Sequence, residues 1–514
     1  MEYLQFLQGL KRPTPRPTAK ASKSAPPAPQ VRRPSNTLPA VRRPHPAQPG
    51  SSSPASEPDS PARRRPIAPP SRSTPVEPRH RLQAPTRAGS TKRKRSRSPV
   101  AHRSQARRSL SPIPVPSEVT ATPPVVIPAS RGLETAVSGT PPISCRELVV
   151  NDARAYTTYF TWPDATDPPS LFNPVHLEYP GPGPGEAYVL AVPRSAAGDA
   201  YSPVKDLIAT VQTIVQHLVP PDTAAASFGT GSTGLLRRLE RASNRRLGPD
   251  FVAAIAEFSA ELARVKATPA FRAHLREVAA RGLPLDLVTH LLHQVYSRTV
   301  APHAETLTAY KAFSDQVYGE VNPVLVHDFI RQTGLGPGQV FVDLGCGIGN
   351  VVLQVAAEAG CESHGVEVME QPSRLAATQA REFETRLHAY GLPHGRVAVQ
   401  RGDFLNTPGL PATLQLADVV LVNNYAFSST LNQRLLQLFL DLREGTQVIS
   451  LRSFVPVDYR INARTAANPE SILRVRQLPY HSDAVSWTGN GGHYFIHTVD
   501  RGPLRAFWAR HGGA

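Results

Sequence analysis

The chain has 514 residues, with 57 Lys and Arg against 40 Asp and Glu and a formal net charge of +17. Its three cysteines exclude a disulfide framework and a cysteine-based zinc motif, and no apolar run approaches the roughly 18 residues that a membrane helix needs. We therefore expect an intracellular protein of two to four domains with no membrane partner.

Residues 1–143 are expected to form a disordered, Pro- and Arg-rich basic tail. Residues 1–110 hold 24 of the Lys and Arg, four acids and 21 of the 54 prolines, which leaves the rest of the chain at −3. Such a composition cannot bury enough apolar surface to offset chain entropy. Its clusters "RRRP" (63–66) and "TKRKRSRSP" (91–99) predict phosphate contacts with DNA, and the second resembles a nuclear localisation signal. A solvated linker is the alternative.

Residues 144–312 are expected to form a mainly helical subdomain that packs on the C-terminal part of the chain. Order should begin near residues 144–150. "YTTYFTWPD" and "EAYVLAVPR" predict short strands, and helical periodicity runs through "VKDLIATVQTIVQHLV", "FVAAIAEFSAELARV" and "LDLVTHLLHQVY". This block carries no chemical signature of its own.

From residue 313 to residue 514 strands and helices alternate. Strands are expected at 339–344, 363–367, 396–400, 418–423, 446–451, 472–478 and 493–499, and helices at 350–360, 371–390 and 429–443. Seven strands in a β-α-β alternation predict a doubly wound α/β sheet. A loop joins the last two strands, so one of them should be antiparallel.

The stretch "VFVDLGCGIGN" places Gly345, Gly347 and Gly349 in a loop after a strand, where doubly wound sheets bind ligands. A dinucleotide fingerprint needs G-x-G-x-x-G and a P-loop needs Gly-Lys, and neither is present. Asp343 would repel a pyrophosphate but attract an ammonium group. S-adenosylmethionine has that ammonium, and its carboxylate suits the N–H groups at the helix start near Asn350. A tight turn without a ligand is the alternative.

The ends of the next two strands carry acids that suit the same cofactor. Glu367 can accept both ribose hydroxyls. In "GDFL" (402–405), Asp403 can accept from the adenine amino group and Phe404 can stack on the ring. Together with the glycine loop, these residues predict S-adenosylmethionine.

"VNNYAF" (422–427) closes the fourth strand, where such enzymes present the methyl acceptor. Asn423 can orient an N–H group, and aromatic faces favour the cationic methyl–sulfonium system. DNA adenine methyltransferases have Asn-Pro-Pro-Tyr here, and both prolines are missing. An enzyme acting on RNA or DNA and a non-catalytic chromatin-binding module are the alternatives to an enzyme that methylates a protein amine.

The motifs "FSDQVYGE", "DLGCGIGNVVLQVA", "GVE", "RGDFL", "VNNYAF", "RINAR", "VSWTG" and "HYFIHTVDR" occur in this order between residues 313 and 501. In this series the chain resembles the disruptor-of-telomeric-silencing family, the histone H3 lysine methyltransferases without a SET domain, and its layout resembles the fungal members. The resemblance implies a class I AdoMet-methyltransferase fold. It also implies an enzyme that methylates a lysine in the globular core of histone H3 within nucleosomes, in chromatin regulation and telomeric silencing. We expect this enzyme to be nuclear and monomeric.

The resemblance also implies roles for particular residues. The "YGE" loop with Tyr318 and Glu320 would cover the cofactor, and Phe313 would lie beside the methyl group. A narrow channel for the lysine would be lined by Asn423, Trp487 and Tyr494. An apolar channel lowers the pKa of a lysine from about 10.4, and positioning then does most of the catalysis, without a metal.

"RINAR" would place Arg460 and Arg464 against the acidic patch of the histone octamer. A solvated loop with internal salt bridges is the alternative. For Trp487 and Tyr425, the alternative is an ordinary role in the core.

Overall fold

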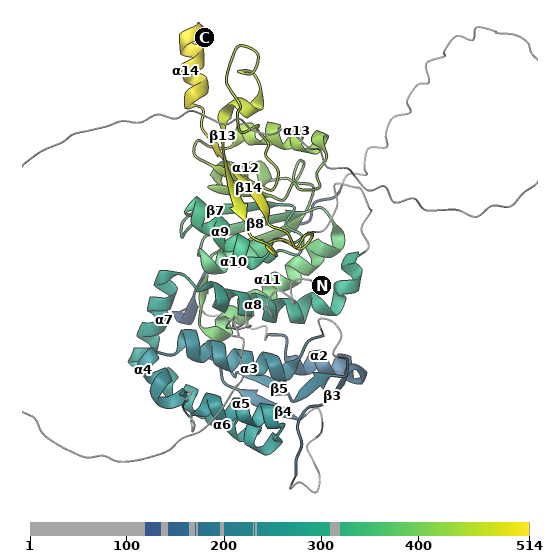
Figure 1. Ribbon diagram of the computed structural model, residues 1–514, viewed down its shortest axis with the longest axis vertical. Helices are drawn as coiled ribbons and strands as arrows, with labels where there is room; N and C mark the ends of the chain where they lie inside the picture. The colour runs from purple at the N-terminus through teal and green to yellow at the C-terminus, as the bar shows by residue number, and fades with distance from the viewer. Residues whose placement is uncertain are drawn as a thin grey trace, which may run out of the picture. The chain divides into compact units, whose positions relative to one another are not determined.

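The computed structural model describes residues 119–134, 142–163, 170, 173–195, 200–229, 231, 234–308 and 319–512. All of them belong to one compact unit (Figure 1). The basic clusters of the predicted tail lie outside the described residues, and so do Phe313 and Tyr318.

An eight-stranded sheet forms the centre of the C-terminal half, in the order β1-β10-β8-β7-β11-β12-β14-β13. The strands are β1 (Val125–Ile127), β7 (Val340–Leu344), β8 (Glu362–Glu367), β10 (Val397–Arg401), β11 (Val419–Val422), β12 (Gln447–Ser450), β13 (Leu473–Tyr480) and β14 (Gly492–Val499). The five strands from β10 to β12 are parallel, whereas β14 is antiparallel to both of its neighbours. All seven predicted strands and the antiparallel one among them are confirmed.

The predicted tail boundary at residue 143 is wrong. Strand β1 pairs antiparallel with β10 and adds an eighth strand, with Ile127 buried. Next to it, β2 (Ser130–Arg131) pairs with β9 (Pro393–His394), and η1 (Gly132–Glu134) comes directly after β2. Three residues are too few to show the alternation of buried and exposed side chains that predicts a strand. The β-branched residues 125–127 form a strand because the edge of β10 is open for pairing.

Helices cover both faces of the sheet, as a doubly wound fold requires. Side chains alternate along the central strands. Phe341, Leu421 and Ile449 pack with α9 (Pro323–Thr333) and α10 (Asn350–Glu358), whereas Val342, Val420 and Val448 pack with α12 (Leu410–Leu416) and α13 (Ser429–Leu438). Helix α11 (Glu370–Tyr390) packs along β10 and β8. The remaining helices are η6 (Phe439–Asp441) before β12, η7 (Pro469–Ile472) before β13, and α14 (Gly502–His511) after β14. The expected class I methyltransferase architecture is confirmed.

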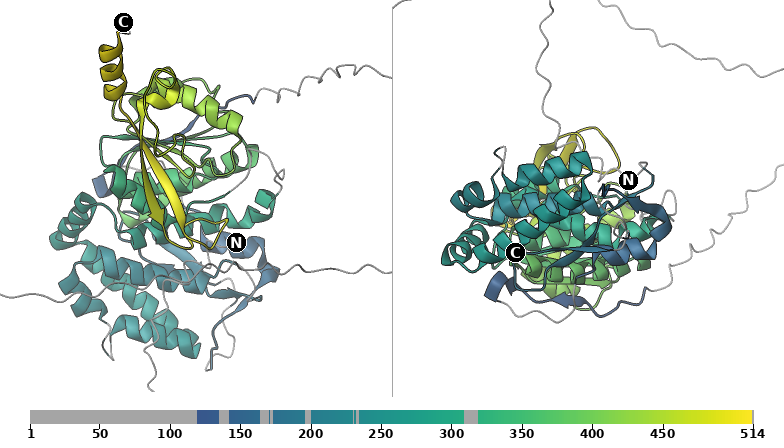
Figure 2. Two further views of the ribbon diagram at one scale, coloured as in Figure 1. Left: turned by 45° about the horizontal axis from the view of Figure 1, so that its top comes forward. Right: turned by 90° about the horizontal axis from the view of Figure 1, so that it is seen from below.

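The described residues from 142 to 308 form a mainly helical block (Figure 2). Its helices are α2 (Cys145–Asn151), η2 (Ala153–Ala155), α3 (Pro203–Thr213), η3 (Ile214–Leu218), α4 (Pro221–Thr223), η4 (Ala224–Phe228), α5 (Leu235–Arg245), α6 (Gly248–Lys266), α7 (Pro269–Arg281), α8 (Leu285–Thr299) and η5 (Ala301–Thr308). Two antiparallel strand pairs join β3 (Tyr156–Thr158) to β6 (Ala191–Pro193) and β4 (Pro174–Leu177) to β5 (Glu186–Val189). Among the described helices, none combines the length and apolarity needed to cross a membrane.

A buried ionic network joins this block to the sheet domain. Arg298 of α8 donates to Glu186 at 2.9 Å and to Asp206 at 2.8 Å, and Arg386 of α11 donates to the other oxygen of Glu186 at 2.5 Å and to Glu382 at 2.7 Å. All five side chains are almost fully buried. Burial acts to raise the pKa of Glu186, but the charges of Arg298 and then Arg386 outweigh it and lower that pKa. Because α11 also flanks the glycine loop, this network fixes the helical block relative to the candidate site.

Candidate active site

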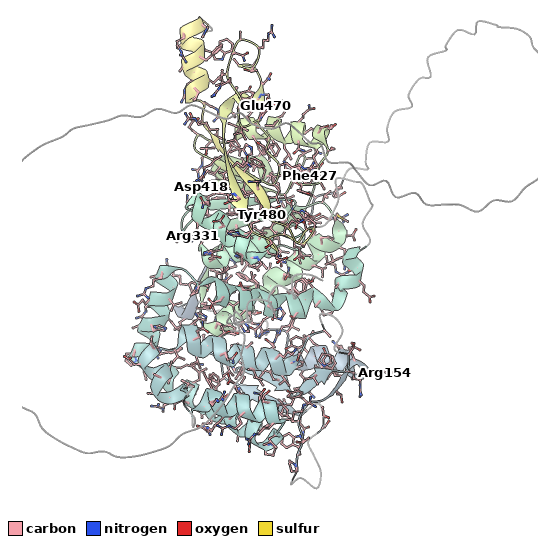
Figure 3. The ribbon with its side chains drawn as sticks, in the orientation of Figure 1. Arg154, Arg331, Asp418, Phe427, Glu470 and Tyr480 are labelled. Carbon is pink, nitrogen blue, oxygen red and sulfur yellow. The ribbon has the colours of Figure 1, made fainter. Side chains whose placement is uncertain are left out.

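The candidate residues gather at the edge of the sheet where the parallel strands end. Figure 3 labels Asp418, which precedes β11, and Phe427, which follows it, on opposite sides of the sheet domain. The candidate residues Asp343, Glu367 and Asn423 lie at or just beyond the C-terminal ends of β7, β8 and β11. They share one edge of the sheet with Phe427, because neighbouring parallel strands end at the same edge.

The glycine loop needs its glycines for backbone geometry. Gly345, Gly347 and Gly349 have φ values of 94°, 54° and 86°, which other L-residues rarely adopt. The loop is held against β8 because Gly345 and Cys346 donate their N–H groups to the carbonyl of Val366, at 2.9 and 3.1 Å. A side chain at Gly345 would meet nothing within 4 Å, so the backbone there faces open space that a ligand can approach.

Asp343 is a buried acid without a compensating cation. Its exposed fraction is 3%, and no described residue donates a hydrogen bond to its carboxyl or pairs with it. Burial, and then the charge of Glu367, raise the pKa of Asp343 to about 8. A bound ammonium group would supply the missing positive charge and favour the carboxylate. The environment of Asp343 therefore fits S-adenosylmethionine.

Glu367 holds the loop and the start of α11 together. One carboxyl oxygen accepts from the N–H of Gly347 at 2.9 Å, and the other accepts from the N–H of Met369 at 2.7 Å. Burial raises the pKa of Glu367 against the effect of these backbone hydrogen bonds. Each carboxyl oxygen has a second lone pair that can accept a further hydrogen bond, so the geometry is compatible with the predicted role of Glu367 toward the ribose.

Asp403 and Phe404 lie on the turn after β10. The Asp403 carboxyl accepts from the N–H of Leu405 at 3.0 Å and from the side chain of Asn406 at 2.7 Å, so it orders its own turn. The N–H of Gly402 donates to the carbonyl of Glu367 at 3.0 Å, which places this turn beside the ribose-binding candidate. The Phe404 ring is half-buried, 6.3 Å from the ring of Phe427. Adenine binding by this turn stays a prediction.

Asn423 has an amide oxygen that lacks a donor. Its amide nitrogen donates to the carbonyl of Gly319 at 3.2 Å, whereas its oxygen is buried and has no partner among the described residues. A buried acceptor without a donor costs free energy, so this oxygen suits a donor from a ligand or substrate. On the other side of Gly319, Glu320 approaches Asn350 at 3.4 Å, so the segment beginning at residue 319 connects the acceptor residue to the start of α10.

Trp487 packs against this segment. A side chain at Gly319 would meet the Trp487 ring at 2.7 Å, and the Tyr425 ring lies 5.2 Å away. The segment is fixed because Glu320 and Ser486 exchange two hydrogen bonds, at 2.8 and 2.9 Å. The indole N–H of Trp487 is buried without a partner in the described part of the chain. Trp487 and Asn423 therefore both approach Gly319, and both have a buried polar atom without a partner among the described residues. Their shared role in a lysine channel stays a prediction.

Tyr494 is fully buried in the core beneath Val485. Its hydroxyl donates to Asp328 of α9 at 2.6 Å, and its ring lies 4.9 Å from that of Phe329. Burial, and then the hydrogen bond to Asp328, raise the pKa of Tyr494, so the hydroxyl stays protonated. No described contact joins it to Asn423, and its role in a substrate channel stays a prediction.

Arg460 and Arg464 lie exposed on the loop between β12 and η7. Asn462 and Thr465 shape this loop, since the N–H of Arg464 donates to the Asn462 side chain at 2.9 Å and Thr465 donates to the carbonyl of Arg460 at 2.7 Å. Among the described residues, neither guanidinium forms an ion pair. The alternative of internal salt bridges therefore finds no support here, and contact with an acidic surface stays a prediction.

Sequence reasoning missed Asn424 and Arg452. Asn424 is buried and makes four hydrogen bonds that connect the end of β11 to the end of β12 and to α13. Arg452 lies over the ring of Tyr425. A signal for Asn424 was present in "VNNYAF", because a polar residue that closely follows an apolar strand needs hydrogen-bond partners. Arg452 carried no signal of its own.

Comparison with known proteins agrees with the motifs. Residues 296–499 match the family model described as "Histone methylation protein DOT1". Proteins named "Histone-lysine N-methyltransferase, H3 lysine-79 specific" match from Aspergillus fumigatus (41% identity, 64% of this chain, 65% of the relative), Emericella nidulans (40%, 65%, 66%) and Mycosarcoma maydis (43%, 57%, 37%). The match therefore spans less than two thirds of the length of each of these relatives.

Overall likeness to solved structures is low. An RNA methyltransferase from Salinibacter ruber in complex with S-adenosyl-L-homocysteine matches 34% of this chain and 91% of its own, at 19% identity and a TM-score of 0.22. The series of motifs and the matches to fungal relatives agree on one family. Over residues 296–499, the chain carries the domain of the histone methylation protein DOT1 family.

Proposed function

We propose that this protein transfers the methyl group of S-adenosylmethionine to a lysine in the globular core of histone H3 within the nucleosome. One observation carries the proposal. Asp343, which pairs with no cation among the described residues, is the last but one residue of β7. Asn423 lies directly after the neighbouring β11, and its amide oxygen has no donor in the described part of the chain. The pairing of Asp343 with Leu421 puts Asn423 only two residues further along the same edge. These are the groups that a cationic cofactor and an amine acceptor need side by side.

S-adenosylmethionine, when bound, supplies an electrophilic methyl group. Asp343 would hold its ammonium group, Glu367 its ribose, and the turn of Asp403 and Phe404 its adenine. The N–H groups of the glycine loop and of Asn350 would face its carboxylate.

Asn423 would accept an N–H of the lysine and fix the direction of the amine lone pair. A lysine is a nucleophile only when it is neutral, and the partly buried ring of Trp487 would help to exclude water and to disfavour the charged form of the lysine. The catalytic contribution of the chain is then mainly positioning. The displacement of the methyl group from the sulfonium by an amine requires no metal ion.

The wider setting is part of the proposal. Arg460 and Arg464 would bind the acidic patch of the histone octamer, and the basic clusters within residues 1–110 would bind nucleosomal DNA. Both suit a monomeric enzyme that acts in the nucleus on chromatin, with a part in telomeric silencing. The names of the fungal relatives support a histone H3 substrate. The exposed guanidinium groups of Arg460 and Arg464, which form no ion pair with any described residue, support contact with an acidic surface.

The test uses radiolabelled S-adenosylmethionine with intact nucleosomes, free histone H3 and naked DNA as acceptors. We expect label in H3 from nucleosomes, a loss of at least about 100-fold in Asn423→Ala, and unchanged labelling by Asn244→Ala, an exposed Asn of α5. Cofactor binding by Asn423→Ala should persist. Label in nucleic acid would establish the alternative substrate, and tight cofactor binding without any transfer would point to a binding module.

A further inference from the structure

Arg452 lies at the exposed end of a chain of aromatic contacts that leads to Asn423. Its guanidinium carbon lies 5.0 Å from the centre of the Tyr425 ring, and Tyr425 is 42% exposed. The Tyr425 ring in turn contacts Trp487, which packs beside Asn423. No acidic side chain in the described ranges pairs with Arg452. The chain of contacts thus presents an uncompensated cation beside the proposed acceptor site.

The backbone of Arg452 is held more firmly than an exposed residue requires. The side-chain oxygen of Asn424 accepts from the N–H groups of Leu451 and Arg452, at 3.1 and 2.8 Å, and its nitrogen donates to the carbonyl of Arg452 at 3.0 Å. Ser450 donates to the same carbonyl at 2.8 Å. Asn424 is 1% exposed and is the covalent neighbour of both Asn423 and Tyr425. The position of Arg452 is therefore fixed relative to Asn423.

We propose that Arg452 determines substrate specificity by binding a carboxylate that flanks the acceptor lysine, with Asn424 as its positioning residue. The inference rests on the proposed function. A guanidinium stacked on a ring keeps its N–H edge open for two parallel bonds to a carboxylate. Stacking also reduces the side-chain freedom that is lost when the substrate binds. The same cation disfavours a lysine flanked by Lys or Arg, which adds discrimination.

The test combines variants on both sides of the contact. Each Asp or Glu within three residues of the methylated lysine of H3 is changed singly to Asn or Gln, and nucleosomes with each histone are assayed with wild type, Arg452→Ala and Asn424→Ala. We expect Arg452→Ala to lower kcat/KM about tenfold, mainly through KM, because one exposed charge-assisted contact is lost. Cofactor affinity should not change. Arg272→Ala, an exposed arginine of α7, is the matched control.

The decisive result is non-additivity. One neutralised histone should lower the wild-type kcat/KM by the same factor, and Arg452→Ala and Asn424→Ala should lose nothing more on that histone. Arg452→Glu should regain activity when that acid is replaced by Lys. Equal losses on every histone would overturn the inference and leave Asn424 with a purely structural role. Absence of H3 labelling by the wild type would overturn the proposed function itself, and this outcome is distinct from an Arg452 effect.

Discussion

Replacing Asp343 by Asn should stabilise the protein and abolish its cofactor site. The buried carboxyl has its pKa raised to about 8 from an ordinary value of 3.8. Between these two pH values the unfolded chain has released the proton and the folded chain retains it. Wild-type stability therefore falls as the pH rises from about 4 to 8.

The size of the effect depends on the difference between the two pKa values. At pH 7 the perturbation costs about 4 kcal/mol of unfolding free energy, and at pH 5 about 1.5 kcal/mol. An Asn at this position has no charge to bury, so Asp343→Asn should gain most of these amounts. The gain is reduced by the cost of a buried amide without partners, about 1–3 kcal/mol.

The assay is urea unfolding of wild type and Asp343→Asn at pH 5, 6 and 7, with Asp222→Asn, an exposed acid of α4, as the control. The advantage of Asp343→Asn should widen as the pH rises, whereas the control should show no trend. Saturating S-adenosylmethionine should reverse the order. At 1,000 times its Kd it stabilises the wild type by about 4.1 kcal/mol, which is more than the expected net advantage of the variant, and the variant should gain little.

Two results would refute this reasoning. A stability difference that does not change between pH 5 and pH 7 would show that the Asp343 carboxyl is ionised in the folded protein. Cofactor binding by Asp343→Asn with wild-type affinity would show that the carboxyl does not hold the ammonium group.

Three further predictions concern other buried polar groups. Burial lowers the pKa of His497 to about 4. The stability contributed by the neutral ring is therefore complete above pH 6.5, and it decreases by up to about 3 kcal/mol as the pH falls to 4. Urea unfolding of His497→Asn should not show this loss. Arg298→Met should lower the unfolding free energy by about 3–5 kcal/mol because Glu186 and Asp206 lose a buried countercharge, whereas Arg238→Met, which removes an exposed ion pair, should cost under about 1 kcal/mol in the same denaturation series. Glu367→Gln should weaken S-adenosylmethionine binding at least about tenfold in a calorimetric titration, since one amide oxygen cannot replace two carboxylate oxygens toward backbone N–H groups and ribose; unchanged affinity would contradict the ribose assignment.

Local features of the sequence predicted much of the fold and the position of the candidate cofactor residues at one edge of the sheet. The strand and helix periods located all seven strands after residue 313, because alternation along one strand reports which side chains are buried. The three glycines of the loop are likewise a local matter, since each of them has a positive φ. Acids at the ends of consecutive strands converge because parallel strands share one edge.

Other features depended on partners that are distant along the chain, and they became visible only in the folded protein. Arg386 and Glu186 are 200 residues apart, and nothing around either one predicts a buried ion pair. Strand β1 exists because β10 offers an edge, and Tyr494 donates to Asp328 because α9 packs across β14. The sequence also determined that Asn423 comes directly after a strand, but the unpaired state of its oxygen depends on Gly319 and on every other residue packed around it. Hydrogen bonds and ion pairs between residues distant along the chain depend on how the elements pack, and a local sequence pattern does not predict that packing.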